Sequence, residues 1–282
     1  MSHAESAAST DIPSLAAQFK TELAAGSLDL PLLPGVAAEV LSSSLDDHAD
    51  AARLADLIQQ DQALATHVLR VVNSPAFRGA IEIVALQQAI ARLGMERIRE
   101  IALSASLKGA LFEGGRYQTV ADESWQIALA AGLWSKEIAR ACRKNVEMAY
   151  LCGLLHNIGV PLVLHRVGQL APDLPRESVD QLLSELVQPA GVVLAKEWQL
   201  PGLVAVTIAH LDDFAAAGED ADAVAVAGTG SALGNWMCTR GILISEVNAL
   251  ASTQHLGLYP DDVAEILEKM DDIKISLESM NI

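Results

Sequence analysis

The chain has 282 residues, of which 51% are apolar and only 4% aromatic. A core of that composition is built from Leu, Ala, Ile and Val, which favours packed helices, and the length suits one large domain or two closely packed subdomains. The 19 basic and 36 acidic residues give a net charge of −17, which repels phosphate backbones and anionic lipid headgroups. We therefore expect an all-α protein that binds no nucleic acid and no membrane surface unless a local basic patch exists.

The cysteines and the N-terminus indicate the compartment. Cys142, Cys152 and Cys238 are widely spaced among apolar neighbours and form no Cys-x-x-Cys pair, which predicts reduced core residues. Residues 1–11 have neither a basic start nor a hydrophobic block, and no segment has the ~18 uninterrupted apolar residues that a membrane span needs. The sequence therefore predicts a cytoplasmic protein.

In the first part of the chain, apolar positions recur at helical spacing. Two helices are expected to meet at Asp61, whose carboxylate would cap the second, over residues 62–72. Asn73 precedes Ser-Pro and should end that helix, with its side chain satisfying nearby backbone groups. His67 lies on an apolar helix and is predicted to be a core or boundary residue. Gly94 separates two helical patterns as a left-handed cap residue does.

The paired glycines at 114–115 interrupt two long helical patterns and are the best candidate for an internal boundary. Beyond them the periodicity predicts a further series of helices, and Asp261 is a candidate cap for the closing segment. The expected helices cover residues 122–143, 145–157, 177–187, 189–198, 202–210 and 221–237, followed by one or two within 260–282.

The stretch over residues 150–159 is an apolar helix that ends in His156, Asn157 and, two residues later, Gly159. It resembles the signature of the HD superfamily of nucleotide phosphohydrolases, in which an adjacent His-Asp pair holds a divalent cation that activates water. Here Asn157 takes the place of the aspartate. An amide supplies an oxygen but no charge, so it neither neutralises a cation nor acts as a base at neutral pH.

Several motifs occur together over roughly residues 30–236, namely LPLLP at 30–34, LIQQD at 57–61, NSPAF at 73–77, AIARLG at 89–94, Trp125, GLLHNIG at 153–159, and WQLP at 198–201 leading to His210. Together they resemble one family, the HDOD domains. The resemblance implies an all-α, multi-helix HD-like fold, in which an N-terminal helical subdomain packs on a degenerate HD subdomain, and a link to bacterial signal transduction. HDOD proteins often lack the metal ligands of HD hydrolases.

This resemblance and the paired glycines divide the chain into four parts. We expect an N-terminal extension with one helix over residues 1–29 and an N-terminal helical subdomain over 30–115. A degenerate HD-like subdomain is expected over 116–240, and a helical closing segment over 241–282.

The chain departs from the hydrolase pattern at nearly every ligand. An ungapped reading places Ile127 at the first histidine and Asn157 at the dyad aspartate. It finds no histidine near Val187 and no aspartate at residues 227–229. The remnant pocket therefore retains two histidine donors, which with the amide make up the candidate site: His156, Asn157 and His210.

Two imidazoles and an amide lack the compensating negative charge that a hard divalent ion requires. We therefore favour a structural role for His156, although Asp212 or Asp213 could approach it, and two histidines could collect adventitious zinc. No cofactor is expected, with a divalent metal held by His156 and His210 as the alternative. No phosphate loop or Ser-His-Asp set suggests another chemistry.

The leading hypothesis is thus a catalytically inactive signalling protein that acts as a scaffold or regulator. Its partner would be another signalling protein, such as a sensor, a response-regulator module or a cyclic-dinucleotide enzyme. Two alternatives remain open. One is a divergent metal-dependent phosphohydrolase, and the other is a sensor that binds a nucleotide or other small molecule in the former active-site pocket without turnover.

Overall fold

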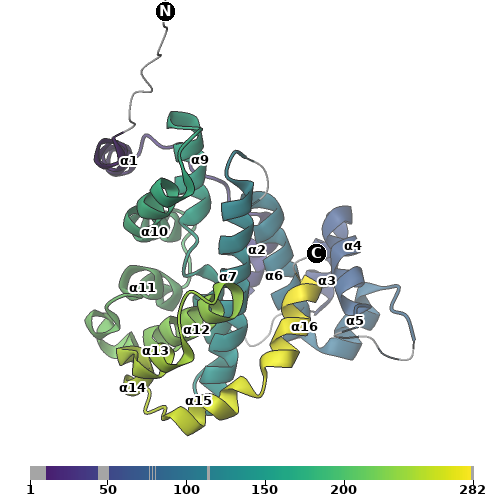
Figure 1. Ribbon diagram of the computed structural model, residues 1–282. Coiled ribbons are helices and arrows are strands. Elements are labelled where there is room, and N and C mark those ends of the chain that lie inside the picture. Colours follow the sequence, from purple (N-terminus) through teal and green to yellow (C-terminus); the bar gives the residue numbers. More distant parts are fainter. Residues whose placement is uncertain are drawn as a thin grey trace, which may run out of the picture.

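The computed structural model describes residues 11–43, 51–75, 77, 79, 81–112 and 115–280, and in that part every regular element is a helix (Figure 1). The predicted all-α fold is confirmed. The elements are α1 (Ile12–Ala25), α2 (Gly35–Ser43), α3 (Ala51–Gln60), α4 (Gln62–Val72), α5 (Leu86–Leu93), α6 (Met95–Leu111), α7 (Gln118–Ala141), α8 (Val146–Leu155), α9 (Val160–Leu170), α10 (Arg176–Glu197), α11 (Gly202–His210), the 3₁₀ helix η1 (Phe214–Asp220), α12 (Ala221–Thr239), α13 (Ile244–Ala249), α14 (Ala251–His255), α15 (Pro260–Leu267) and α16 (Met270–Met280).

The long helix α7 runs through the middle of the molecule (Figure 1). Helices α8 and α12 pack along it, and α2 to α5 gather with α6 on one side. On the other side α1 packs on α9 and α10. The chain then returns through α15 and α16, which contact α7, and α16 also contacts α6. The C-terminal helix α16 therefore joins α6 of the first group to the central helix α7.

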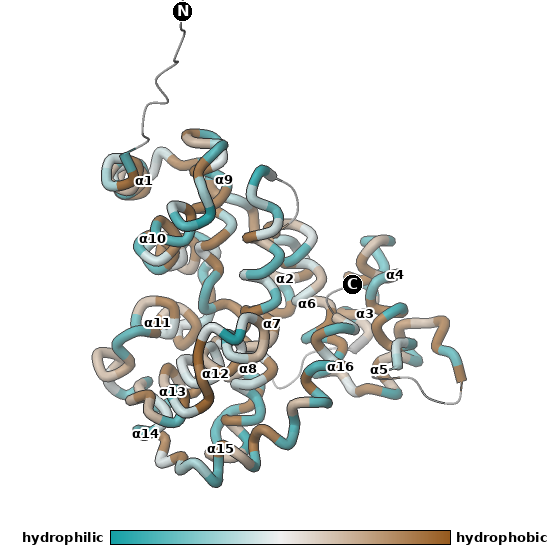
Figure 2. Tube along the Cα trace, viewed as in Figure 1, coloured by the Kyte–Doolittle hydropathy of each residue, from teal (hydrophilic) through white to brown (hydrophobic). Residues whose placement is uncertain are grey.

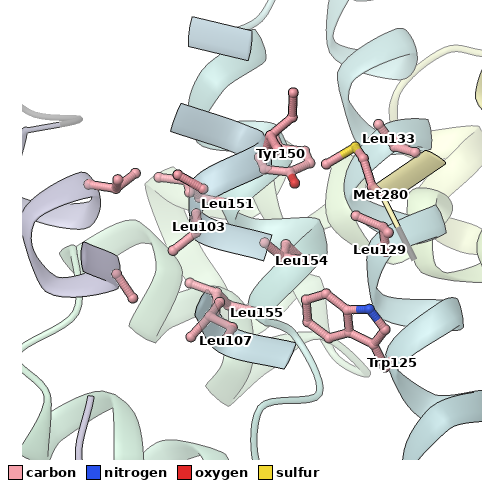
Figure 3. Close-up of a cluster of buried hydrophobic side chains, with 14 of the residues drawn as sticks. Leu103, Leu107, Trp125, Leu129, Leu133, Tyr150, Leu151, Leu154, Leu155 and Met280 are labelled. Atoms are coloured by element: carbon pink, nitrogen blue, oxygen red, sulfur yellow. The ribbon is translucent and has the colours of Figure 1, made fainter. Parts of the chain in front are cut away.

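One large apolar cluster joins helices α2–α6 with α7, α8 and α16, and Figure 3 shows part of it. Trp125 and Trp134 on α7 are almost fully buried, and the Trp125 ring lies 5.2 Å from that of Phe112. Figure 3 shows Trp125 with Tyr150 of α8 and Met280 of α16 in the same cluster. Burying a large apolar side chain contributes about 1.5–3 kcal/mol, so these residues anchor the packing of the helices. Figure 2 shows hydrophobic segments on most helices, as this shared core requires.

Helices α7, α8 and α12 approach each other at backbone distance. A Cβ atom added to Gly230 would lie 2.1 Å from the Ser135 hydroxyl, and one added to Gly153 would lie 2.5 Å from the same atom. A Cβ atom added to Gly234 would lie 2.8 Å from the Ala131 amide nitrogen. Glycine is therefore required where α8 and α12 cross α7, because any larger residue would push the helices apart.

The local predictions for the first group of helices largely hold. The Asp61 carboxylate caps α4 by accepting from the Leu64 amide at 3.0 Å, as predicted. The Asn73 amide donates to the carbonyl oxygens of Leu69 and Ile83 at 2.9 and 2.8 Å, and its oxygen accepts from the Ile83 amide at 2.9 Å. Asn73 thus satisfies local backbone groups and also closes the loop between α4 and α5.

Gly94 differs from its prediction. Its φ is positive, at 83°, but its ψ of 161° is extended rather than left-handed helical. The chain therefore turns between α5 and α6 through a conformation that favours glycine, without a left-handed cap. The boundary predicted at the paired glycines includes Glu113 and Gly114, which lie outside the described residues, and the four-part division of the chain stays a prediction.

Three predicted elements were wrong in detail. The two helices expected on either side of Pro189 are one helix, α10. A proline inside a helix costs about 3 kcal/mol, and apolar burial on both sides of it offsets that cost, since Leu186 and Ala190 belong to one buried cluster with α1 and α9. Helix α7 begins at Gln118, one turn earlier than expected. Asp261 does not cap α15, because the Tyr259 amide donates to Asp262 instead, at 2.8 Å.

One stretch is long and apolar enough to cross a membrane by length and composition, namely Val146–Leu170, which comprises α8, the turn after it and α9. In this protein 78% of its most apolar window is buried. The stretch is a core element of the helical fold.

Candidate functional site

Helix α8 and the turn after it present the signature residues. The Asn145 side chain accepts from the Met148 amide at 3.0 Å and so fixes where α8 begins. The body of α8 is apolar and buried between α7, α11 and α12. His156 and Asn157 follow its last residue, Leu155, in the turn that leads to α9. The sequence placed both within the helix, whereas the structure places both directly after it.

Both ring nitrogens of His156 are hydrogen-bonded within the protein. Nδ1 lies 2.7 Å from the Gly153 carbonyl oxygen, and Nε2 lies 3.1 Å from the Ser231 hydroxyl on α12. A carbonyl oxygen only accepts, so Nδ1 carries the hydrogen and Nε2 accepts from Ser231. Burial lowers the pKa of His156, against the opposing effects of the Gly153 carbonyl and the nearby Asp212 carboxylate. The imidazole is therefore neutral at neutral pH, and its one lone pair is engaged by a hydroxyl.

Asn157 ties the same turn to α7. Its amide nitrogen donates to the Ser124 carbonyl oxygen at 3.0 Å. Its oxygen is buried and accepts no hydrogen bond in the described part of the chain. The side chain therefore offers one uncharged oxygen to the interior of the site, as the sequence indicated.

His210 takes no part in the hydrogen bonds of His156 and Asn157 within the part of the chain that the structure describes. It is the last residue of α11, and its carbonyl oxygen accepts from the Asp213 amide at 3.1 Å. Its imidazole forms no hydrogen bond or ion pair with His156 or Asn157 in the described residues. Across residues 11–43, 51–75, 81–112 and 115–280, no three His, Cys, Asp or Glu side chains are grouped so that they could hold a metal ion.

The residues present do not fit a hydrolytic metal centre. Such a centre needs several oxygen ligands with compensating charge and an open position for water. His156 has its only lone pair occupied by Ser231, and the free oxygen of Asn157 is neutral. Asp212 acts on the pKa of His156 but belongs to no metal-binding group in the described chain.

Sequence reasoning missed Ser231. The ungapped reading placed the late acidic ligand at residues 227–229 of α12, whereas the contact with His156 comes about one helical turn later. A serine within a helix rich in Ala and Gly carries no distinctive signal. Ser231 meets His156 because α12 packs against α8, a contact that the sequence alone does not indicate.

The sequence model of the HDOD domain family matches residues 30–214 of this chain. The chain belongs to the HDOD domain family. A curated relative, an uncharacterised protein of Treponema pallidum (strain Nichols), is 27% identical to this HDOD chain over 195 residues. The match covers 64% of the chain and 37% of the relative, so the chain corresponds to about a third of that protein.

Solved structures show the same fold. An HDOD domain protein with unknown function from Geobacter sulfurreducens matches with a TM-score of 0.73 and 21% identity, covering 95% of this chain and 97% of that one. A proposed metal-dependent phosphohydrolase from Shewanella amazonensis SB2B matches with a TM-score of 0.71 and 20% identity, covering 96% and 98%. A proposed signal transduction protein from Marinobacter aquaeolei VT8 matches with a TM-score of 0.64 and 21% identity, covering 96% and 66%.

Proposed function

We propose that this HDOD protein is a catalytically inactive signal-transduction protein of the bacterial cytoplasm, which regulates or assembles other proteins by binding them. The observation that carries the proposal is the hydrogen bond from Ser231 to Nε2 of His156. This bond uses the lone pair that a metal ion would need, next to an amide where the hydrolases have a carboxylate. The fold is shared with a proposed signal transduction protein and equally with a proposed metal-dependent phosphohydrolase, so the signalling role rests on the chemistry of the site.

Metal content tests the inactive part of the proposal. Untagged protein is purified without added metal, incubated with Mg²⁺, Mn²⁺, Fe²⁺ or Zn²⁺, desalted and subjected to elemental analysis. We expect a substoichiometric result and no hydrolysis of p-nitrophenyl phosphate. A content of about one or two ions per chain, together with phosphatase activity abolished by His156→Ala, would establish the phosphohydrolase alternative instead.

Two substitutions test whether the named residues cause the loss of the site. The variant Asn157→Asp restores the charge, and Ser231→Ala releases Nε2 of His156. We expect the double variant to gain Mn²⁺ affinity over the wild type and over either single variant, because both defects are then removed. Equal and weak metal retention in all four proteins would mean that other missing ligands limit binding.

Protein binding is tested at the most exposed apolar side chains of the loop between α4 and α5. Ile81 and Val84 are 74% and 71% exposed. The Asn73 side chain holds the backbone of Ile83, next to Val84, in place. We expect size-exclusion chromatography with purified sensor, response-regulator and cyclic-dinucleotide modules to reveal a stoichiometric complex that Ile81→Asp/Val84→Asp disrupts. Tyr259→Asp, at a side chain 73% exposed on the distant α15 end, is the matched control. Absence of any complex would count against the scaffold role.

A further inference from the structure

A cavity that is not lined by His156 lies where α6, α7 and α16 meet the residues after α4. It has a volume of about 370 Å³. Figure 1 shows α16 running from the side of α7 toward α6, and residues of α16 line part of the cavity. Four of its lining side chains are basic: Arg97, Lys136, Arg140 and Lys269. They come from three parts of the sequence more than 30 residues apart.

Lys136 is the most buried of these cations. Its side chain is only 9% exposed, and its ammonium group pairs with Glu100, which is equally buried. Arg97 donates to the other oxygen of the same carboxylate at 2.8 Å. An ammonium has three donors and a guanidinium has five, so one shared carboxylate uses only a minority of these N–H groups. Lys136 also lies over the Tyr150 ring, at 5.6 Å from the ring centroid. Arg97 lies over the Phe77 ring, at 5.1 Å from the ring centroid.

The rest of the lining keeps the excess of positive charge. Arg140 pairs with Glu137, and Asp272 of α16 also lines the cavity. Lys269, in the turn before α16, makes no side-chain hydrogen bond or ion pair with any described residue. With Glu100 included, four cations face three carboxylates. This local positive charge stands out in a chain whose net charge is −17.

We propose that this cavity binds a small organic phosphate, whose phosphate group is held by Arg97, Lys136 and Lys269. Guanidinium and ammonium groups that converge on one space suit a phosphate, and the volume lies within the range of small-molecule sites. Apolar lining from Phe77 and Ile273 provides contact for the organic part. The inference concerns a different site from His156 and does not rest on the proposed function.

Binding would add polar contacts between helices that the apolar core and the Lys136–Glu100 ion pair already join. Arg97 belongs to α6 and Lys136 to α7, whereas Lys269 directly precedes α16. A phosphate between them makes charge-assisted hydrogen bonds to all three segments, so the ligand should stabilise the folded chain in proportion to its occupancy.

The test is isothermal titration calorimetry on the full chain, with inorganic phosphate, pyrophosphate and adenosine monophosphate as probes at constant ionic strength. We expect saturable binding of one probe molecule per chain for at least one of them. Lys269→Ala should weaken it about tenfold, because the substitution removes one charge-assisted hydrogen bond. Lys269 is exposed and pairs with no charged residue in the part of the chain that the structure describes, so this variant should keep the fold, as far-ultraviolet circular dichroism would verify.

Lys274→Ala is the matched control. It removes one positive charge from α16 at a lysine that pairs with Asp271 at 3.7 Å and with no other described residue, and that does not line the cavity. We expect its affinity to equal that of the wild type. Absence of saturable binding by all three probes would overturn the proposal, as would equal weakening in Lys269→Ala and Lys274→Ala, which would mark a nonspecific charge effect.

Discussion

Replacing Gly159 by alanine is predicted to disrupt the packing behind the signature turn. Gly159 precedes α9 with a φ of −70°, so the backbone conformation itself accepts any residue. The obstacle is space. An added Cβ would lie 2.1 Å from the Val187 carbonyl oxygen and 2.7 Å from the Gly191 amide nitrogen, both on α10. The first distance is more than 1 Å shorter than the 3.4 Å at which ordinary contact begins.

The clash cannot be relieved by rotating a side chain, because both atoms belong to the backbone of α10. The helix must move away from the turn, and with it the cluster that Leu186 and Ala190 form with α1 and α9. Overpacking of this kind costs about 1–3 kcal/mol, and a rigid backbone neighbour places the variant at the upper end. We therefore expect Gly159→Ala to lose about 3 kcal/mol, which lowers Tm by about 6 °C or more.

Urea denaturation followed by circular dichroism measures this loss as a shift of the midpoint at constant m-value. Gly109→Ala is the matched control, since Gly109 lies in α6 with nothing within 4 Å of the added Cβ. That variant should gain up to about 1 kcal/mol from helix propensity. A Gly159→Ala protein within about 0.5 kcal/mol of the wild type would refute the close approach of the turn to α10.

Three further predictions concern polar side chains. Asn73→Ala should cost about 2–3 kcal/mol, because three hydrogen bonds are lost, and should speed hydrogen exchange of the Ile83 amide. Burial lowers the pKa of His67 from 6.5 to about 4, and the positive charges of Arg70 and Lys108 add to this effect. On acidification the unfolded chain therefore takes up a proton before the folded chain does. The free energy of unfolding should fall between pH 6.5 and 4. In urea titrations at several pH values, His67→Gln should flatten this fall. Ser231→Ala should cost about 1 kcal/mol and shift the ¹⁵N resonance of the Nε2 atom of His156.

Each of these has an outcome that contradicts it. An unchanged exchange rate at Ile83 in Asn73→Ala would show that the loop does not depend on this side chain. A pH profile of His67→Gln that parallels the wild type would assign the acid sensitivity to other groups. The variant Ser231→Thr retains a hydroxyl and should keep the resonance of the Nε2 atom of His156. An equal shift of that resonance in Ser231→Ala and Ser231→Thr would argue against the hydrogen bond.

Local features of this protein could be predicted from its sequence because their causes lie within one or two helical turns. The apolar periodicity gave the helices, and Asp61 caps α4 because a carboxylate before an apolar run can accept from a free first-turn amide. The loss of charge at Asn157 is likewise a property of one side chain. Even so, Pro189 misled local reasoning, because the burial that keeps α10 continuous comes from α1 and α9.

Contacts between distant segments were decided only by the tertiary structure. Ser231 and His156 are 75 residues apart, and which serine meets the imidazole depends on how α12 crosses α8. The same holds for the basic cavity, since the sequence showed an acidic chain and only packing brings Arg97, Lys136 and Lys269 together. Periodicity determines which face of a helix is buried, but not which residue lies opposite, because that follows from the crossing of helices at their glycines.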